Sequence, residues 1–430
     1  MAQYSKGRKA FFHGGNDDIY EVVMLSDQFG NLIGPANPSG VAVDAFGRAR
    51  MSSPYTLFDS SNVIQKNDKF DESITGSGSN VVYSYDESTV ELILSTDANS
   101  SVIRQSKRNF SYQPGKSLLI LNTYVFAPPQ AGLTQRVGYF NDNDGIFLEY
   151  SGGQLYIVLR SSTTGGPEEI RVPSTSWNSD KLDSEGTSHI SLNPTASQIF
   201  WIDLEWLGVG TVRTGFVIDG KFVVAHSFHN ANIHNKVYMR TPNLPIRYEI
   251  SNSTELTSYP TMKQVCSSVI SEGGYEARAL QHVYGTALAG NGTITANTFM
   301  NLVTIRMENY PSYDIDSIVV PSGVDILNVA NTDFEWGLFL NATATGLNYN
   351  TATTRVQYAI DGVNLTSTGR RIAGGYMGGK TAPFSLGDGG FDWDYQLGRT
   401  IAGVSDTLTL AVRATSTSKN AAGMIKWYEL

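Results

Sequence analysis

Apolar and polar residues alternate with a period of two along much of this chain, which is the pattern of strands with one buried face. The run Ser117–Phe126 is such a segment, and the prolines at 128 and 129 end it. Two further segments, Gly145–Tyr150 and Gln154–Arg160, flank a Ser-Gly-Gly turn. Their alternation and the turn between them predict a β-hairpin.

The same pattern continues downstream. A strand is predicted over 198–207, where Gly208-Val-Gly210 forms the turn that follows. Arg213–Ile218 and Lys221–His226 flank Asp219-Gly220, which is the strongest short-range hairpin signal. No stretch of twelve residues shows a clean helical stripe of apolar positions. Short strands at this spacing favour a β-sandwich or barrel.

Three regions differ in composition. Residues 1–75 are rich in Gly, Asn, Asp and Pro, with little sustained alternation, and we interpret them as an extended arm. The segment 74–80, Ile-Thr-Gly-Ser-Gly-Ser-Asn, predicts a flexible joint. We place a first β-domain at 80–252 and a second at 260–430. The expected fold class is all-β: an extended N-terminal arm, a jelly-roll sandwich and a second, smaller β-sandwich.

Charge and cysteine content exclude several classes of protein. Of the 430 residues only 17% are charged, with 31 Lys and Arg against 40 Asp and Glu, so the net charge is -9. A general nucleic-acid binder needs an excess of cations. The single cysteine excludes a disulfide framework and zinc sites with two Cys ligands. No apolar run of about 18 residues occurs, so we expect no membrane span and no membrane partner.

One segment fits a phosphate-binding motif in full. Gly374–Thr381, Gly-Gly-Tyr-Met-Gly-Gly-Lys-Thr, matches G-x-x-x-x-G-K-[ST]. That chemistry needs a helix after the loop, so that backbone N–H groups face phosphate oxygens. Thr381 is instead followed by Ala-Pro-Phe-Ser-Leu-Gly-Asp-Gly-Gly, whose glycines do not favour a helix. We expect a glycine-rich loop between strands, with no nucleotide and no other cofactor.

Two carboxylates share a face of the strand predicted over 198–207. Trp201, Asp203 and Glu205 lie on that face, and carboxylates so spaced lie about 6–7 Å apart. The segment resembles the E-x-D-x-E strand of the laminarinase-like glycosidases, which implies a lectin-like jelly roll for the first domain. The nucleophile position of that motif is Trp201 here, so we expect no catalytic residues. A glycan or partner contact through these three residues, and a purely structural strand, both stay open.

A histidine cluster and an acidic cluster are candidate metal sites. Three histidines lie between 226 and 234, but their spacing is not that of a helical zinc motif. Asn141–Asp144 begins like a calcium loop. The EF-hand pattern would need an acid at 140 and Glu at 151, where the chain has Phe and Ser. We expect a β-turn at Asn141–Asp144 and no metal site.

Long motifs lie near both ends of the chain. Val41–Asp59 contains Ala-Phe-Gly-Arg-Ala-Arg and then Pro-Tyr-Thr-Leu-Phe-Asp. Phe391–Thr400 contains Tyr-Gln-Leu-Gly-Arg-Thr, and Gly423–Leu430 ends in Trp-Tyr-Glu-Leu. These segments, and the middle of the chain from 141 to 220, resemble the structural proteins of tailed-phage virions, many from marine and cyanobacterial phages. The resemblance spans most of the chain.

The resemblance implies a place in the virion, and it brings no catalytic residues, so we expect no enzyme. We expect an accessory exterior component, a decoration or fibre-like protein of head, neck or tail, that contacts other virion proteins and forms a homo-oligomer, with a trimer preferred. The low charge agrees, because interfaces are depleted in Lys and Glu. The alternative is a tail protein that recognises host surface glycan. An arm can add strands to a neighbour's sheet, and its expected anchoring residues are Phe46, Arg48, Arg50, Leu57 and Phe58.

Overall fold

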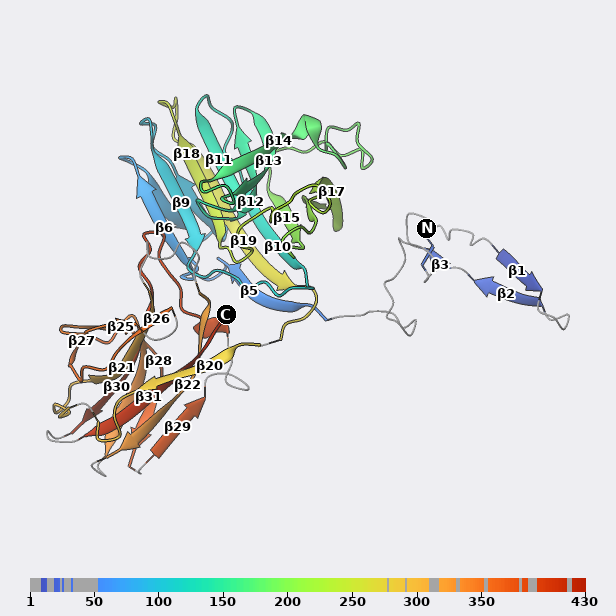
Figure 1. The fold of residues 1–430 in the computed structure, drawn as a ribbon. Helices are drawn as coiled ribbons and strands as arrows, with labels where there is room; N and C mark the ends of the chain where they lie inside the picture. Colours follow the sequence, from blue (N-terminus) through green and yellow to red (C-terminus); the bar gives the residue numbers. More distant parts are fainter. Residues whose placement is uncertain are drawn as a thin grey trace. The chain divides into compact units, whose positions relative to one another are not determined.

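The computed structural model divides the chain into two units, Met1–Ser53 and Pro54–Leu430 (Figure 1). It describes residues 53–430, with gaps at 277, 291, 309–316, 330–332, 352–354, 379–380, 386–392 and 416–419, and the backbone of four short strands before residue 53. The expected anchoring residues Phe46, Arg48 and Arg50 lie outside the described residues.

The four strands of the first unit form two antiparallel pairs. β1 (Lys9–His13) pairs with β2 (Ile19–Val23). β3 (Leu25–Ser26) pairs with β4 (Leu32–Ile33). All the pairings described for these strands are therefore within the first unit.

The larger unit begins with an eight-stranded antiparallel sheet. Seven strands follow the order β17-β16-β15-β10-β19-β8-β7, and β5 pairs with the second half of β19. Their bounds are β5 (Tyr55–Ser61), β7 (Asn80–Ser84), β8 (Thr89–Ile93), β10 (Leu118–Val125), β15 (Gln198–Leu204), β16 (Val212–Ile218), β17 (Lys221–Phe228) and β19 (Thr261–Ser271).

A seven-stranded sheet packs against it, in the order β14-β13-β12-β11-β18-β9-β6. Buried residues of both sheets, among them Ile120 and Val137, form one hydrophobic core. A 3-10 turn at Ser174–Ser176 follows β14. The strand bounds are β6 (Phe70–Thr75), β9 (Ser101–Ser106), β11 (Leu133–Phe140), β12 (Gly145–Ser151), β13 (Gln154–Ser161), β14 (Glu168–Pro173) and β18 (Ile246–Asn252).

Local sequence explains the strands that were predicted. Along β10 buried and half-buried residues alternate strictly, since successive side chains point to opposite faces. The hairpin of β16 and β17 turns at Asp219 and Gly220, with φ angles of 52° and 73°. A type I′ turn needs positive φ at both central positions, which Asp-Gly tolerates. The hairpin of β12 and β13 turns at Gly152-Gly153, also with positive φ. Both predicted hairpins are confirmed.

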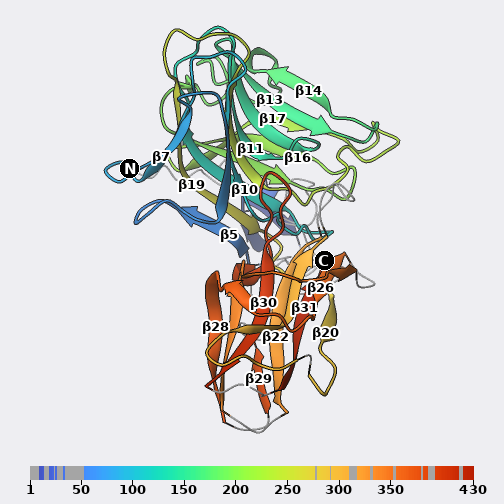
Figure 2. The ribbon, with the colours of Figure 1, turned by 90° about the vertical axis from the view of Figure 1, so that its left-hand side faces the viewer.

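The second sandwich pairs a four-stranded sheet, β20-β31-β22-β29, with a six-stranded sheet, β25-β26-β21-β30-β23-β28 (Figure 2). β24 and β27 form a small separate pair, and a 3-10 turn lies at Trp393–Tyr395. The bounds are β20 (Leu280–Gly285), β21 (Met300–Met307), β22 (Val319–Asn328), β23 (Phe334–Leu340), β24 (Thr343–Ala344), β25 (Asn350–Thr351), β26 (Val356–Ala359), β27 (Leu365–Ser367), β28 (Arg370–Met377), β29 (Thr381–Ser385), β30 (Thr407–Ala414) and β31 (Ala421–Glu429).

The predicted fold class, all-β with a jelly-roll sandwich and a second, smaller sandwich, is confirmed. Two predicted boundaries are wrong. The arm does not reach residue 75, because β5 and β6 pair within the two sheets of the first sandwich. The first sandwich does not end at 252, because β19 lies between β10 and β8 in its sheet. Among the described residues, no helix is long and apolar enough to cross a membrane.

Leu57 and Phe58 are core residues, which corrects their assignment to arm anchoring. Both are buried in the first core, 6% and 3% exposed. The register between β19 and β5 shifts beside them, since Val269 opposes Phe58 and Ile270 opposes Thr56. Leu57 is therefore the extra residue of a β-bulge, which lets two successive side chains turn toward the core.

The two sandwiches are joined within the larger unit. Ile318, directly before β22 of the second sandwich, and Val320 on β22 belong to the first core, and Leu430 packs against it. The backbone N–H of Ile401 donates to Asp71 at 2.8 Å. The backbone N–H of Arg399 donates to the carbonyl of Lys107 at 2.7 Å. Apolar packing and hydrogen bonds thus both cross the junction.

Candidate functional site

The three residues that sequence reasoning nominated on β15 do not form an open binding face. Trp201 is only 3% exposed, and its ring packs edge-on against Phe222 at 5.5 Å between ring centroids. Asp203 shares its face and accepts from Nε of Arg213 at 2.9 Å. β15 ends at Leu204, so Glu205 lies beyond the strand and is exposed. A sugar contact through the ring of Trp201, which the sequence left open, is contradicted because the ring is covered.

The candidate metal residues serve backbone structure instead. Oδ1 of Asn141 accepts from the N–H groups of Asn143 and Asp144, both at 2.9 Å, which confirms the predicted turn. Oδ1 of the buried Asp144 accepts from the N–H groups of Ser162 and Arg240, both at 3.1 Å. Within the described part of the chain, no group of three or more His, Cys, Asp or Glu is placed to hold a metal ion.

His226 is an acceptor in the wall of the first sandwich. Its Nδ1 accepts from the backbone N–H of Asn178 at 3.3 Å. Burial, and to a lesser extent His229, lowers the pKa of His226. A neutral imidazole keeps the Nδ1 lone pair that this hydrogen bond requires.

Sequence reasoning missed a charged layer on the outer face of the seven-stranded sheet. Arg136 on β11 opposes Glu149 on β12 and Glu249 on β18. Its Nε donates to Glu149 and its Nη1 to Glu249, both at 2.8 Å. Arg171 donates to Glu149 at 3.1 Å, and Arg247 pairs with Glu249 at 2.7 Å. We name this the first Arg–Glu layer; it comprises Arg136, Arg160, Arg171, Arg247, Glu149, Glu169 and Glu249.

Aromatic rings lie beneath this layer. The guanidinium carbon of Arg160 lies 4.9 Å from the ring centroid of Phe147, and that of Arg247 lies 5.4 Å from Phe140. Both rings are fully buried. Gly138 makes room for them, because a Cβ there would lie 2.5 Å from the carbonyl oxygen of Ile146 and 2.7 Å from Cα of Phe147. Cation–π attraction and ion pairing therefore hold the same guanidinium groups.

The first Arg–Glu layer does not suit acid–base catalysis. Burial on its own would raise the pKa of Glu249, but Arg247, Arg136 and Arg160 outweigh it and hold that pKa below its usual range. A general acid that cleaves a glycoside needs a raised pKa. In addition, Arg136 lies between Glu149 and Glu249, so no space separates the two carboxylates for a sugar. The arrangement closes the sheet face rather than opening it to a substrate.

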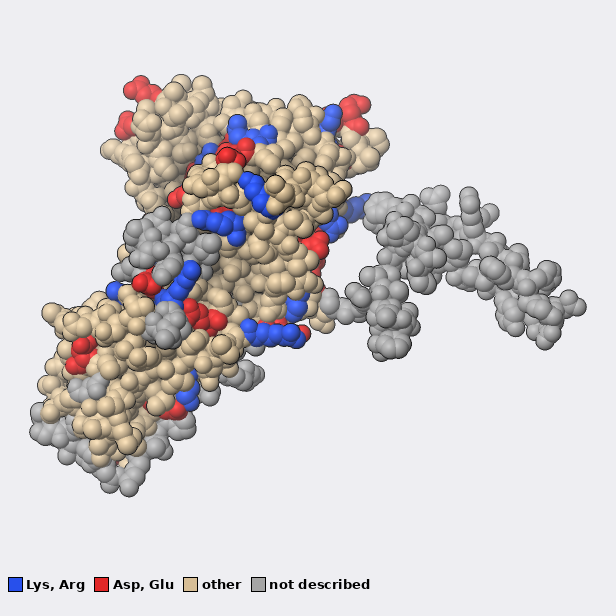
Figure 3. Space-filling view, viewed as in Figure 1, with Lys and Arg blue, Asp and Glu red and all other residues tan. Residues whose placement is uncertain are grey.

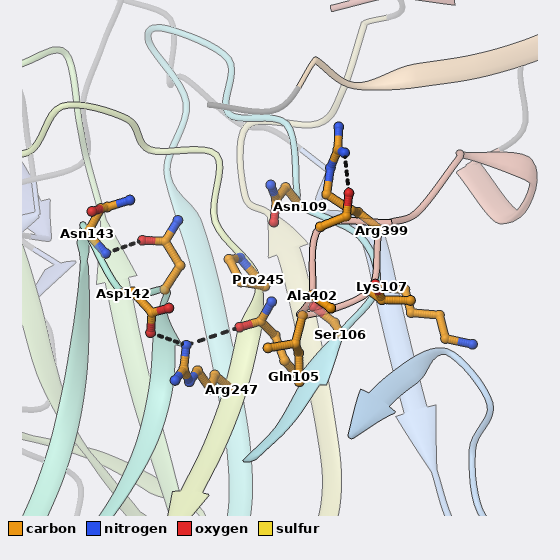
Figure 4. Close-up of a pocket in the computed structure, with 14 residues that line it drawn as sticks. Gln105, Ser106, Lys107, Asn109, Asp142, Asn143, Pro245, Arg247, Arg399 and Ala402 are labelled. Carbon is orange, nitrogen blue, oxygen red and sulfur yellow. Dashed lines mark hydrogen bonds and ion pairs between the residues drawn. The ribbon is translucent and has the colours of Figure 1, made fainter. Parts of the chain in front are cut away.

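A pocket of about 240 Å³ lies at the end of this layer, between the two sandwiches (Figure 4). Arg247 lines it and donates to Asp142 at 2.7 Å. Arg399 lines the other side and donates to the carbonyls of Gly403 at 2.7 Å and Glu308 at 2.8 Å. Both arginines are thus held by protein partners, and the pocket forms part of the junction.

The second sandwich carries a smaller layer of the same kind. Glu335 on β23 accepts from Arg371 at 2.5 Å and from Arg413 at 2.6 Å. The guanidinium of Arg413 lies 4.7 Å from the ring of Phe299. We name these three charged residues, Arg371, Arg413 and Glu335, the second Arg–Glu layer. Burial would raise the pKa of Glu335, but the two arginines hold it below its usual range.

Gly374–Thr381, which matches the phosphate-binding motif, begins within strand β28. The side chain of Arg371 lies over Gly374, where a Cβ would meet the guanidinium. Thr381 begins strand β29, where a phosphate site would need a helix. The glycine at 374 therefore gives space to the second Arg–Glu layer.

Comparison with known proteins adds a few distant likenesses. No family model and no curated protein matches the sequence. Among solved structures, the carbohydrate recognition domain of Emp47p is 11% identical, covers 54% of this chain and 100% of its own, and has a TM-score of 0.32. Arcelin-5, a lectin-like defence protein from Phaseolus vulgaris, is 8% identical, and the match covers 52% of this chain and 100% of arcelin-5 with a TM-score of 0.32. A glycoside hydrolase family protein from Mycobacterium thermorestibile is 9% identical, and the match covers 50% of this chain and 99% of that protein with a TM-score of 0.33. At these scores the likenesses support no statement on function.

Proposed function

We propose that this protein is a non-catalytic structural component of a tailed-phage virion, accessory and exterior, attached to head, neck or tail through its N-terminal segment. The division of the chain after Ser53 supports this, since it separates a short N-terminal unit from a body of two joined sandwiches. An attachment segment outside a folded body is what a decorating protein needs.

The segments that resemble virion proteins build the body rather than a reactive site. Tyr55–Asp59 belongs to β5. Gln396 donates to the carbonyl of Asn109 at 2.8 Å across the junction of the two sandwiches. The last segment forms β31, where Trp427 is fully buried. This structural use of the motifs is the observation that carries the proposal.

The surface of the body supports a role among neighbours. In the view of Figure 3 charged groups are sparse and blue and red atoms often adjoin, so that most of the visible described surface is uncharged. Leu119, Leu121 and Ile270 lie half-buried on the outer face of the eight-stranded sheet, and Phe222 at its rim is 54% exposed. Weakly charged faces with apolar rows are easier to desolvate than Lys- and Glu-covered ones. Homo-oligomerisation, with a trimer preferred, is part of the proposal.

Truncation and labelling of phage particles test this function. Deletion of residues 1–53 leaves β5 intact, so we expect an unchanged thermal unfolding transition and loss of the protein from purified particles. Immunogold labelling with antibody against the first sandwich should mark particles carrying the full chain. As a control, Tyr85→Ala alters a side chain that is 73% exposed on the body and should leave labelling unchanged. Truncated protein that still decorates particles, or full-length protein that never does, would contradict the proposal.

Host-glycan recognition stays the alternative function. Because the ring of Trp201 is covered, the strand face that the sequence nominated for glycan contact is not available through this residue. Trp206, which follows Glu205 in the sequence, is also partly buried, and its Nε1 donates to the carbonyl of Met239 at 2.9 Å. A glycan site would therefore have to lie elsewhere in the chain.

A further inference from the structure

A second pocket, of about 350 Å³, lies at one end of the six-stranded sheet in the second sandwich. β23 begins there at Phe334, and β28 and β30 end there at Met377 and Ala414. The opposite end of β28 is Arg370, which pairs with Asp68 of the first sandwich at 3.2 Å. Met377 is seven residue steps along the strand from Arg370, which is about 23 Å. The pocket is thus at the end of β28 away from the first sandwich.

The walls of this pocket combine an apolar floor with a polar rim. Phe334, Met377 and Ala414 are adjacent across the three strands and are 3%, 4% and 5% exposed. One residue along, Tyr376 opposes Glu335, which in turn opposes Arg413. These three side chains lie on the other face of the sheet. The pocket lies where these strands end, so that buried carbon atoms of one sheet face and hydrogen-bonding groups of the other face both line it.

Tyr376 is the most exposed large apolar side chain in the described part of the chain, at 86%. It lies on β28, the edge strand of its sheet, and lines the pocket. An aromatic ring left in water forgoes the stabilisation that burial would give. A flat ring in this position is suited to stacking against the C–H face of a sugar.

Three polar groups of the pocket have no partner within the described residues. The carboxylate of Asp333, the side-chain amide of Asn297 and the hydroxyl of Tyr376 make no hydrogen bond or ion pair there. The junction pocket differs, since Arg247 and Arg399 are held by partners. Groups that converge without protein partners are free to bind a ligand, and a few such groups beside apolar walls are typical of small-molecule sites.

The charges that line the pocket limit the class of ligand that it can bind. Asp333 and Glu335 contribute two negative charges and Arg413 one positive charge. Glu335 already accepts from Arg371 and Arg413, so Asp333 is the free acceptor for hydroxyl donors. A carboxylated ligand would meet Asp333 with like charge, which disfavours it.

We propose that this pocket binds a neutral hexopyranose residue of a glycan, with one sugar face on the ring of Tyr376 and hydroxyl groups on Asp333 and Asn297. This site goes beyond the structural role proposed above and does not depend on it. The ligand needs no metal, since the donors and acceptors are those of the chain itself.

Binding of defined oligosaccharides to the full-length protein tests the site. The probes are neutral oligomers of glucose, galactose and mannose, with an oligogalacturonate of equal length as the acidic comparison. We expect at least one neutral oligomer to bind and the acidic one to bind at least about tenfold more weakly, as one unfavourable charge contact would cause. Isothermal titration calorimetry measures both affinities.

Variants assign the binding to this pocket. Tyr376→Ala and Asp333→Asn should each weaken the affinity about tenfold or more, because a stacking ring or a charged acceptor is lost. Tyr85→Ala removes a ring that is 73% exposed on the first sandwich and should leave binding unchanged. Both pocket residues are exposed, so the thermal transition should stay the same. The proposal is overturned if no neutral oligomer binds, if the acidic oligomer binds as tightly, or if Tyr376→Ala retains full affinity. Particle labelling, which tests the structural role, is unaffected by any of these results.

Discussion

The two Arg–Glu layers use the same chemistry in different degrees of burial. In both, guanidinium groups lie over phenylalanine rings and pair with glutamates from adjacent strands. In the first layer the side chains of Glu149 and Glu249 are 1% and 9% exposed. In the second layer the side chain of Glu335 is 11% exposed, so the glutamates of the two layers differ little. The arginines differ more, because Arg371 and Arg413 are 39% and 43% exposed, whereas Arg136 and Arg247 of the first layer are 23% and 5% exposed. Water therefore reaches the arginines of the second, open layer more than those of the first, closed layer that pair with Glu249.

This difference decides what each face can do. A buried charge is tolerated only with a full set of partners, so the first layer has little left to offer a ligand. In the second layer Glu335 is held by Arg413. Asp333 and Tyr376, which line the pocket beside this layer, have no hydrogen-bonding or ion-pair partner among the described residues. Binding chemistry is thus expected at the open layer and structural stability at the closed one. The predictions below test that contrast.

The largest effect is expected for Glu249→Gln. It leaves the guanidinium groups of Arg247 and Arg136 without a carboxylate that now lies within 2.8 Å of each. Breaking a buried pair by removing one partner costs about 3–5 kcal/mol. Urea unfolding of the full chain would measure this loss. The control, Glu276→Gln, removes a carboxylate that is 56% exposed and pairs with Arg278, and should cost less than about 1 kcal/mol. Equal losses for the two variants would show that burial does not set the cost of losing Glu249.

The next largest difference in stability is expected between alanine substitutions at two glycines, one in each layer. Gly138→Ala would press a Cβ against the backbone of Ile146 and Phe147, and overpacking of this kind costs about 1–3 kcal/mol. Gly374→Ala meets the guanidinium of Arg371, a long side chain that is 39% exposed and can move aside. We expect the first substitution to lower the unfolding temperature clearly and the second to lower it little. A larger loss for Gly374→Ala would show that the open layer is as rigid as the closed one.

Acid should weaken the closed layer through Glu249. Its pKa is lower in the folded state than in the unfolded state, so the stability that it contributes is present above the usual carboxyl range, about pH 4–5, and is lost as pH falls through its lower folded pKa. Unfolding free energies measured from pH 7 downward should therefore decrease less steeply in Glu249→Gln than in the unmodified protein. Parallel pH profiles would contradict the assignment.

The smallest effect is expected for Glu335→Gln. The carboxylate of Glu335 is 11% exposed, but the guanidinium groups of Arg371 and Arg413 are 39% and 43% exposed and can be solvated when it is removed. The loss should therefore be about 0–1 kcal/mol, as for pairs whose partners water reaches. Unfolding of this variant should match the unmodified protein within that range, as calorimetry would show. A loss as large as that of Glu249→Gln would remove the distinction between the layers.

Local sequence predicted those elements whose cause is local. Asp219-Gly220 specifies its turn whatever surrounds it, and alternation in Ser117–Phe126 marks a half-buried strand wherever the sheet lies. The strands β5 and β6 were missed because their short segments, with several serines, acidic residues and threonines, gain order only by pairing with β19 and β9. Local sequence does not distinguish Leu57 and Phe58 from residues of an arm, because their burial depends on pairing with the distant strand β19.

The candidate site shows the same limit. Trp201 and Asp203 were correctly placed on one face of their strand, but whether that face is open depends on β16 and β17, which carry Arg213 and Phe222. The only sequence signal of the first Arg–Glu layer was the presence of charged residues, such as Arg136 and Glu149, within predicted strand segments. Nothing in the sequence, however, showed that β11 lies between β12 and β18.

The all-β class and the positions of the tight turns follow from local sequence, because periodicity and turn chemistry act within a few residues, and the low charge follows from composition. Which charges are buried together, and which are left without partners, depends on the tertiary fold. Glu249 lies in the middle of β18 and Asp333 directly before β23, and both are acidic residues. One is enclosed by guanidinium groups and the other lines an open pocket, because strand order, and not residue type, sets their neighbours.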